Sequence, residues 1–416
     1  MGEIEDGFEE LRHTVEPKVR QPDFGVIRGR HRRRVRNQRI ASGTLAVVAI
    51  TAGYGVANRA LNDTAPNLGT AAAVTEHVPP PTGEFGMRDV AFVDAKRGWA
   101  IGSRCGGEGA TERCQAAVSR TVDAGDTWSA PVPVGPTVAK HVFRDSTSPA
   151  SGVARSVRFF NSSTGYAFNP ALFVTADAGR TWRPVPVSGQ VVGVNVSSLG
   201  VLVTTRQCPP EGSPCTTRIL RDRLSTMEPG ELAELPAPLL APRGLDSVQL
   251  RVDGNDIWVL SYGRDAQYLE HSSDVGRRWQ GLRPPCPAYD RQHFSAAGQV
   301  LWVVCTVTDD AEPRRSAKTV YTSSDAGKSW ERRGTPDDLG VTNDLKAVSD
   351  TTAFLSSSHG DLLRTTDGGR SWQVAAEGEG FINLEIPFTN RGWFFGPNGA
   401  LWRYADGKAE RLQGPR

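Results

Sequence analysis

The stretch Thr121-Val-Asp-Ala-Gly-Asp-Thr-Trp128 decides the fold of this chain, because its pattern returns along the sequence. In it, Trp128 follows Asp123 by five positions and Gly125 follows Asp123 by two. Other stretches keep this spacing too often for chance: Thr175-Ala-Asp-Ala-Gly-Arg-Thr-Trp182, Ser272-Ser-Asp-Val-Gly-Arg-Arg-Trp279, Ser323-Ser-Asp-Ala-Gly-Lys-Ser-Trp330 and Thr365-Thr-Asp-Gly-Gly-Arg-Ser-Trp372. A short unit that recurs in this way predicts a repeat protein.

Two further copies of the repeat are degenerate. One keeps Asp222 but has Met227 in the tryptophan position, and the other is a plain hairpin whose Asp406-Gly407 pair suits a tight turn. Upstream of most copies lie short segments such as Gly98-Trp-Ala-Ile-Gly102. Their apolar residues alternate along the chain with the period of two that is typical of β-strands. Four strands per unit predict a propeller blade. The sequence therefore predicts an all-β, seven-bladed β-propeller over residues 84–416.

These stretches resemble the Asp-box (BNR) repeats of sialidases, sortilin-type receptors and other propellers. Together with the Gly98-Trp-Ala-Ile-Gly102 phrase, they make the chain most similar to the photosystem II stability/assembly factor family. That resemblance implies a propeller fold and a role in assembly for photosynthesis. The motif is specific for architecture and weak for function, because unrelated activities share it.

We expect the Asp-box residues to be structural. The aspartate can accept hydrogen bonds across its turn, the glycine two positions later allows a left-handed backbone, and the tryptophan can pack against the blade. One aspartate per blade also keeps the carboxylates far apart. The predicted structural pairs are Asp123 with Trp128, Asp177 with Trp182, Asp274 with Trp279, Asp325 with Trp330, and Asp367 with Trp372.

The N-terminal region has a different composition. Residues 1–39 carry ten Lys/Arg and seven Asp/Glu, seven of the arginines falling in residues 28–39, whereas the whole 416-residue chain has a net charge of only +2. Residues 40–58 contain no charge, which is enough to cross a bilayer. The arginines predict a cytoplasmic N-terminus. We therefore expect a basic cytoplasmic tail (1–39), a single transmembrane helix (40–58) and an extracytoplasmic linker (59–83), which place the propeller outside the cell membrane.

Two questions about this region stay open in the sequence. A cleavable signal peptide with a long basic leader is the alternative to an uncleaved anchor, with Gly55-Val-Ala57 as a small-residue cleavage site. The tail could bind anionic lipid headgroups or dock a cytoplasmic partner. The near-neutral body of the chain argues against a nucleic-acid partner.

All six cysteines lie beyond the predicted membrane span. An even number of cysteines outside the cytoplasm predicts disulfides between sequence neighbours, here Cys105 with Cys114, Cys208 with Cys215, and Cys286 with Cys305. A zinc site is the competing interpretation. The cysteines do not have its usual spacing, and no histidine accompanies them.

No constellation in the sequence predicts a catalytic, cofactor or metal site. The histidines are scattered, and no nucleophile elbow or phosphate-binding loop is present. The candidate carboxylates Asp89, Asp256, Asp344 and Glu385 lie near strand starts. The arginines Arg88, Arg155, Arg158 and Arg251 fall on or beside first strands, which line a propeller channel, so they could bind an acidic partner or ligand.

Two functions fit these observations. The preferred hypothesis is a non-catalytic, membrane-anchored scaffold that offers its loops to an unknown protein or glycan partner. The alternative is a divergent, sialidase-like glycoside hydrolase, which would need two carboxylates facing one pocket. The Arg-Ile-Pro phrase expected of a sialidase is missing, and Glu385-Ile-Pro387 lacks the arginine.

The predicted topology can be tested with fusions to alkaline phosphatase, which folds only in an oxidising compartment. We expect an active enzyme when it is fused after residue 83 and an inactive one after residue 39, because the arginines keep the tail inside. Carbonate washing that releases a propeller with a new N-terminus near Ala57 would instead establish a cleaved signal peptide.

Overall fold

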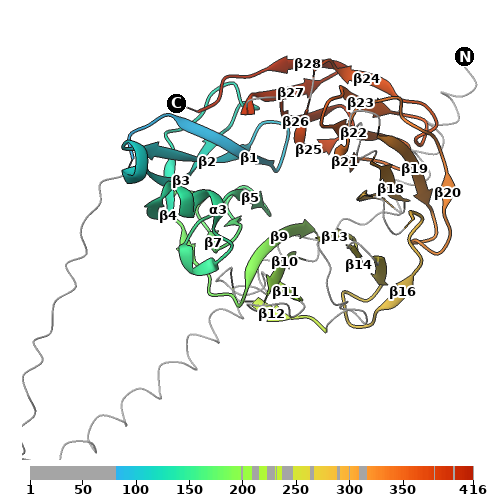
Figure 1. Ribbon diagram of the computed structural model, residues 1–416, viewed down its shortest axis with the longest axis horizontal. Helices are drawn as coiled ribbons and strands as arrows, with labels where there is room; N and C mark the ends of the chain where they lie inside the picture. Colours follow the sequence, from blue (N-terminus) through green and yellow to red (C-terminus); the bar gives the residue numbers. More distant parts are fainter. Residues whose placement is uncertain are drawn as a thin grey trace, which may run out of the picture. The chain divides into compact units, whose positions relative to one another are not determined.

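The computed structural model describes residues 81–197, 200–208, 215–222, 230, 232–236, 247–262, 267–287, 291–298, 300–308, 316–378, 380–396 and 399–415. These residues form seven four-stranded antiparallel sheets arranged around a ring (Figure 1). In every sheet the strands follow chain order from the inside of the ring to the outside. The predicted all-β, seven-bladed propeller is therefore confirmed.

The first four blades have the following strands. Blade 1 contains β1 (Phe85–Phe92), β2 (Gly98–Gly106), β3 (Arg113–Thr121) and β4 (Val132–Ala139), and blade 2 contains β5 (Ser156–Phe159), β6 (Gly165–Phe168), β7 (Leu172–Thr175) and β8 (Arg183–Pro184). Blade 3 contains β9 (Gln190–Ser197), β10 (Gly200–Gln207), β11 (Thr216–Asp222) and β12 (Leu232–Glu234), and blade 4 contains β13 (Ser247–Asp253), β14 (Asp256–Tyr262), β15 (Gln267–Ser272) and β16 (Gln280–Leu282).

The last three blades complete the ring. Blade 5 contains β17 (Arg291–Ala297), β18 (Val300–Val307), β19 (Ala317–Ser323) and β20 (Glu331–Arg332), and blade 6 contains β21 (Thr342–Ala347), β22 (Ala353–Ser357), β23 (Leu362–Thr365) and β24 (Gln373–Ala376). Blade 7 contains β25 (Ile382–Phe388), β26 (Arg391–Phe395), β27 (Leu401–Ala405) and β28 (Lys408–Arg411). The short helices η2 (Gly109–Thr111), α3 (Lys140–Asp145) and η3 (Pro149–Ser151) lie in connections of blades 1 and 2.

The antiparallel order gives the ring two different faces. In blade 1, Phe85 pairs with Arg104, Cys105 with Cys114, and Arg113 with Ala139, so the first strand starts where the fourth strand ends. We call this side, which carries the connections between blades, the connector face. The opposite side carries the turns between third and fourth strands, where the Asp-box repeats lie, and we call it the Asp-box face.

Each Asp-box repeat forms the same hydrogen-bonded turn. Asp123 accepts bonds from the Thr121 hydroxyl at 2.8 Å and from the Thr127 amide at 2.9 Å, and the Gly125 amide donates to Thr121 Oγ1 at 2.9 Å. The residue after the aspartate has a positive φ, as at Ala124 with 66°. Hydrogen bonds from Thr127 lower the pKa of Asp123 to about 2, because they stabilise the charged carboxylate.

Neighbouring blades are joined by an aromatic side chain of a second strand. The indole nitrogens of Trp99, Trp258 and Trp393 donate to the carbonyl oxygens of Ala178, Ala326 and Ala124, at 2.9, 3.2 and 2.9 Å respectively. Each acceptor is the residue after the aspartate in the next Asp-box repeat. The turn therefore presents a backbone carbonyl to the blade before it in the ring.

The degenerate repeat of blade 3 makes this connection differently. Tyr166 of blade 2 occupies the place of the tryptophan, and its hydroxyl donates to the buried Asp222 at 2.5 Å. The amide of Gly230 also donates to Asp222. Asp222 therefore still joins blade 2 to blade 3, although the Asp-box pattern around it is lost.

The ring closes between blade 7 and blade 1 without a shared strand. Trp393 stacks on Phe92 with ring centroids 3.5 Å apart, in addition to its bond to Ala124. Arg403 of blade 7 forms an ion pair with Asp126 of blade 1 at 2.9 Å. Side chains alone therefore hold the two ends of the ring together.

The cysteines form the disulfides that the sequence predicts, Cys105–Cys114, Cys208–Cys215 and Cys286–Cys305. No cysteine is left as a zinc ligand. The first two disulfides close the loops between second and third strands, and the last ties the connection after β16 to β18. All of them lie on the connector face.

The predicted tail, the predicted span at residues 40–58 and the linker up to residue 80 lie outside the described residues. Within the part of the chain that the structure describes, no helix combines the length and the apolar character needed to cross a bilayer.

The contribution of the inter-blade tryptophan hydrogen bond to stability can be measured by comparing the free energies of unfolding of Trp393→Phe and Trp302→Phe. Trp302 is as buried as Trp393, but its indole nitrogen has no hydrogen-bond partner among the described residues. Trp393→Phe should therefore cost about 1 kcal/mol more in the free energy of unfolding, because it also removes the indole hydrogen bond to the Ala124 carbonyl, which then keeps only the longer bond from Arg403 at 3.4 Å. Equal losses in urea denaturation would show that the bond contributes nothing.

Candidate functional site

The central channel is where side chains from all seven blades meet. A cavity of about 300 Å³ is lined by residues of every first strand: Ala91, Phe92, Arg158, Phe159, Val194, Asn195, Val196, Arg251, Val252, Ser295, Ala296, Lys346 and Glu385. Its charged members are Arg158, Arg251, Lys346 and Glu385. The cavity is therefore polar and of mixed charge.

Arg158 forms an ion pair in the wall of this channel. Its Nη1 lies 2.8 Å from Oδ2 of Asp89, whose side chain is only 7% exposed, whereas that of Arg158 is 34% exposed. Burial alone would lower the pKa of Arg158, but Asp89 and Glu385 outweigh it and raise that pKa. Arg158 therefore stays charged at the channel surface.

Asp89 joins two blades by accepting a backbone amide from each, and we call this arrangement a clamp. Its Oδ1 accepts the amide of Val90 in its own strand at 3.0 Å, and its Oδ2 accepts the amide of Val157 in blade 2 at 3.0 Å. Asp344 repeats the arrangement between blades 6 and 7, with Leu345 at 2.9 Å and Leu384 at 3.0 Å. Both aspartates follow an irregularity in strand register.

Other first-strand side chains join neighbouring blades in the same way. Gln249 of blade 4 accepts the Phe294 amide at 3.1 Å, and Ser295 of blade 5 accepts the Ala347 amide at 2.9 Å. Asn383 of blade 7 donates to the carbonyl of Arg88 in blade 1 at 2.9 Å. These inter-blade bonds were not predicted from the sequence, although two first strands carry an aspartate followed by an apolar residue, which was a signal for them.

The four arginines predicted to bind an acidic partner form two separate pairs. Arg158 and Arg251 line the channel. Burial lowers the pKa of Arg251, and its Nη1 donates to the Leu250 carbonyl at 2.9 Å. Arg88 and Arg155 instead flank the ring of Phe143 in α3, with guanidinium carbons 5.5 and 5.9 Å from its centroid. Their binding role stays a prediction.

The four candidate carboxylates are not brought together in one pocket with free oxygens. Asp89 and Asp344 hold backbone amides, and Glu385 lines the channel. Asp256 lies in a separate groove of about 570 Å³ between blades 4 and 5 and contacts Nε2 of His271 at 2.6 Å. Among the described residues, no group of three or more His, Cys, Asp and Glu side chains could hold a metal ion.

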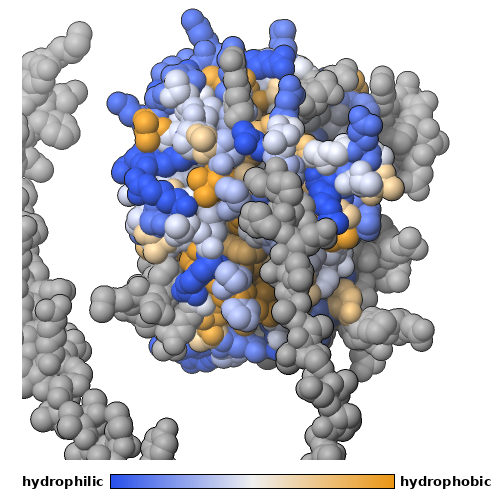
Figure 2. All heavy atoms as spheres, turned by 90° about the vertical axis from the view of Figure 1, so that its left-hand side faces the viewer, coloured by the Kyte–Doolittle hydropathy of each residue, from blue (hydrophilic) through white to orange (hydrophobic). Residues whose placement is uncertain are grey.

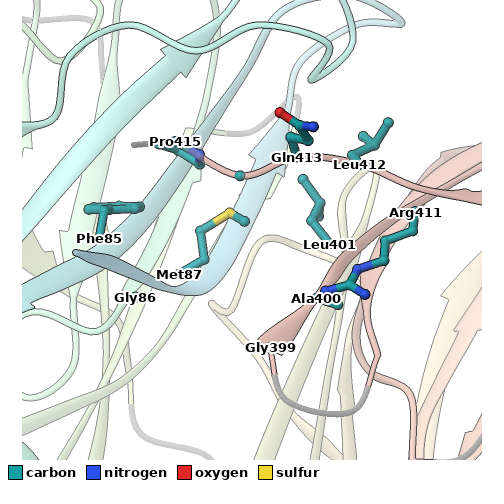
Figure 3. A pocket seen from close by; sticks show the side chains of 11 residues that line it. Phe85, Gly86, Met87, Gly399, Ala400, Leu401, Arg411, Leu412, Gln413 and Pro415 are labelled. Carbon is teal, nitrogen blue, oxygen red and sulfur yellow. The ribbon is translucent and has the colours of Figure 1, made fainter.

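Another groove, of about 690 Å³, lies where the ring closes (Figure 3). Phe85 and Met87 of β1 face Leu401 and Leu412 of blade 7 across it. Arg411 is the one charged side chain among its lining residues. The channel cavity, by contrast, is lined by Arg158, Arg251, Lys346 and Glu385.

Comparison with known proteins shows similarity at the level of fold. No protein-family model and no curated protein matches the chain. Among solved structures, YCF48 from Cyanidioschyzon merolae is 16% identical with a TM-score of 0.50, covering 78% of this chain and 97% of its own. The chain is a β-propeller similar in fold to YCF48. The resemblance drawn from the repeats is confirmed to that extent.

The matches also include two other solved structures. YCF48 bound to D1 peptide is 16% identical with a TM-score of 0.49, covering 79% of this chain and 94% of its own. An acylaminoacyl peptidase from Pyrococcus horikoshii is 10% identical with a TM-score of 0.52, covering 79% of this chain and 52% of its own. At these identities only the fold is shared.

The clamp role of Asp89 can be tested with Asp89→Asn. We expect it to lower the free energy of unfolding by about 2 kcal/mol, because a charged acceptor of three hydrogen bonds is removed from a buried site. Glu385→Gln is the control, since Glu385 lines the same channel, and it should change stability by less than about 0.5 kcal/mol. Similar losses in both variants would contradict the clamp.

Proposed function

We propose that this protein is a non-catalytic, membrane-anchored propeller that binds a protein partner outside the cell membrane, through its connector face. The observation that carries the proposal is the difference between the two faces. The Asp-box face consists of repeated turns whose polar groups bond to one another, as at Asp123 and Asp325. Such turns leave few polar groups free to bind a ligand.

The connector face is built from segments that differ from blade to blade. It carries α3, η2 and η3, and the three disulfides hold its loops. Loops that are fixed on a rigid scaffold are the usual place for recognition, because they vary without disturbing the core. Disulfides further reduce the conformational entropy that ordering such loops would cost on binding.

The positions and hydrogen bonds of the candidate carboxylates support a binding function rather than glycoside hydrolysis. A hydrolase needs one carboxyl group as general acid and a second as nucleophile or base, both facing the sugar. Asp89 and Asp344 already accept backbone amides, and Asp256 lies in a different groove. Glu385 is then the one member of the candidate set left in the channel.

The outer edge of blades 1 and 2 is mostly hydrophilic. Figure 2 shows this side of the ring, where hydrophilic residues predominate and hydrophobic ones form small separate areas. A stable protein interface generally needs a continuous surface of about 800 Å² on each partner. The visible part of this side therefore favours a partner at a face of the ring over one at the edge of blades 1 and 2.

Site-specific photo-crosslinking in cells, using the full chain, tests this proposal. A photoreactive residue at Thr147, in the exposed connection after α3, should capture a discrete partner protein. The same residue at Lys328, in an exposed Asp-box turn, is the matched control and should capture little. Equal capture at both positions, or release of sugars from a glycoside panel by the purified protein, would reject the proposal.

A further inference from the structure

The connector face carries a group of three arginines around one aromatic ring. Arg88, Arg144 and Arg155 gather around Phe143, and we call these four residues the arginine shelf. Phe143 is buried, and the guanidinium groups of Arg88 and Arg155 lie 5.5 and 5.9 Å from its ring centroid. A cation over an aromatic face is held without neutralising its charge.

Two members of the shelf have no acidic partner. Among the described residues, neither Arg88 nor Arg144 forms an ion pair or donates a side-chain hydrogen bond. Arg155 donates instead to the carbonyl oxygens of Phe143 and Ser146, and so fixes α3 in place. Burial, with the nearby charge of Arg144, lowers the pKa of Arg88. Asp145 lies close enough to Arg155 to offset part of the fall in its pKa that burial causes. Three arginines beside this carboxylate still leave an excess of positive charge that an anion would stabilise.

The backbone at Arg88 directs this side chain away from the sheet. The pairing of β1 with β2 skips from Met87 to Asp89, so Arg88 is the extra residue of a β-bulge. Bulges commonly re-aim a side chain near a functional surface. As a result Arg88 is exposed while Asp89 beside it is buried.

Exposed apolar side chains lie on the same face. Val307, at the end of β18, is 52% exposed, Leu339, in the connection before β21, is 54% exposed, and Ile382, at the start of β25, is 42% exposed. Large apolar groups combined with arginines are typical of surfaces that rest on a membrane interface.

The chain also enters the propeller on this face. The described residues begin at Pro81, four positions before the start of β1, and β1 starts on the connector face. The segment predicted to reach the membrane therefore joins the ring on the side that carries the shelf.

From these observations we propose that the connector face rests on the outer leaflet of the membrane, with the arginine shelf binding the phosphate of an anionic phospholipid. The inference rests on the proposed membrane anchor, and it deepens the proposed function. A lipid surface is favoured over an acidic peptide because the chain joins the ring on this face and the apolar side chains share it. Held in this way, the loops around α3 meet partners that are embedded in the bilayer.

The test uses the full-length protein in nanodiscs of phosphatidylcholine alone or with 30% phosphatidylglycerol, a headgroup quencher being present in both. A fluorophore is attached at Thr147→Cys on the connector face or at Lys328→Cys on the Asp-box face. We expect quenching at position 147 to rise at least twofold with phosphatidylglycerol, and position 328 to be unaffected. Arg88→Gln/Arg144→Gln should abolish the increase.

The control variant for that test is Lys96→Gln/Arg97→Gln, which removes the same charge from an exposed turn on the Asp-box face and should keep the increase. Equal quenching in both lipid compositions would overturn the lipid site while leaving the anchor and the protein partner intact. A response to a glutamate-rich peptide in phosphatidylcholine discs, lost in Arg88→Gln/Arg144→Gln, would overturn it in favour of an acidic protein segment. Loss of the protein from the discs would overturn the anchor as well.

Discussion

The joints between blades 1 and 2, 4 and 5, and 7 and 1 depend on one recurring contact, in which a tryptophan of one blade donates a hydrogen bond to the Asp-box turn of the next. The carbonyl oxygen that accepts this bond belongs to a residue with a left-handed backbone, such as Ala124 or Ala326. An L-residue adopts that conformation at a cost, and the hydrogen bonds of the Asp-box aspartate hold it there. The motif therefore stabilises the joint between blades as well as its own turn.

A second set of contacts holds the blades together near the axis. Asp89 and Asp344 each accept an amide from their own strand and one from the next blade, and Gln249, Ser295 and Asn383 make related bonds. The channel wall is thus made largely of side chains that already have partners. Arg158 and Arg251 line the cavity beside them and give the channel a polar, charged wall.

Much of the fold was predictable because the decisive signals are local. The Asp–Gly–Trp spacing identifies the turns of five blades. The cysteines pair with their neighbours in sequence. The site was less predictable because it depends on strand register. The bulge at Arg88 and the insertion of α3 separate Arg88 and Arg155 from Arg158, although all these residues lie near first strands. The inter-blade bond of Asp89 likewise joins positions 68 residues apart, which no local pattern reveals.

The seam between blades 7 and 1 has a consequence for the order in which the molecule is made. Because blade 7 takes all four of its strands from residues 382–411, Phe92, Ala124 and Asp126 have no partners across the seam until that blade has been synthesised. Blade 1 therefore keeps an open apolar edge while blades 2 to 6 are made. The ring becomes a closed object only when blade 7 has been added.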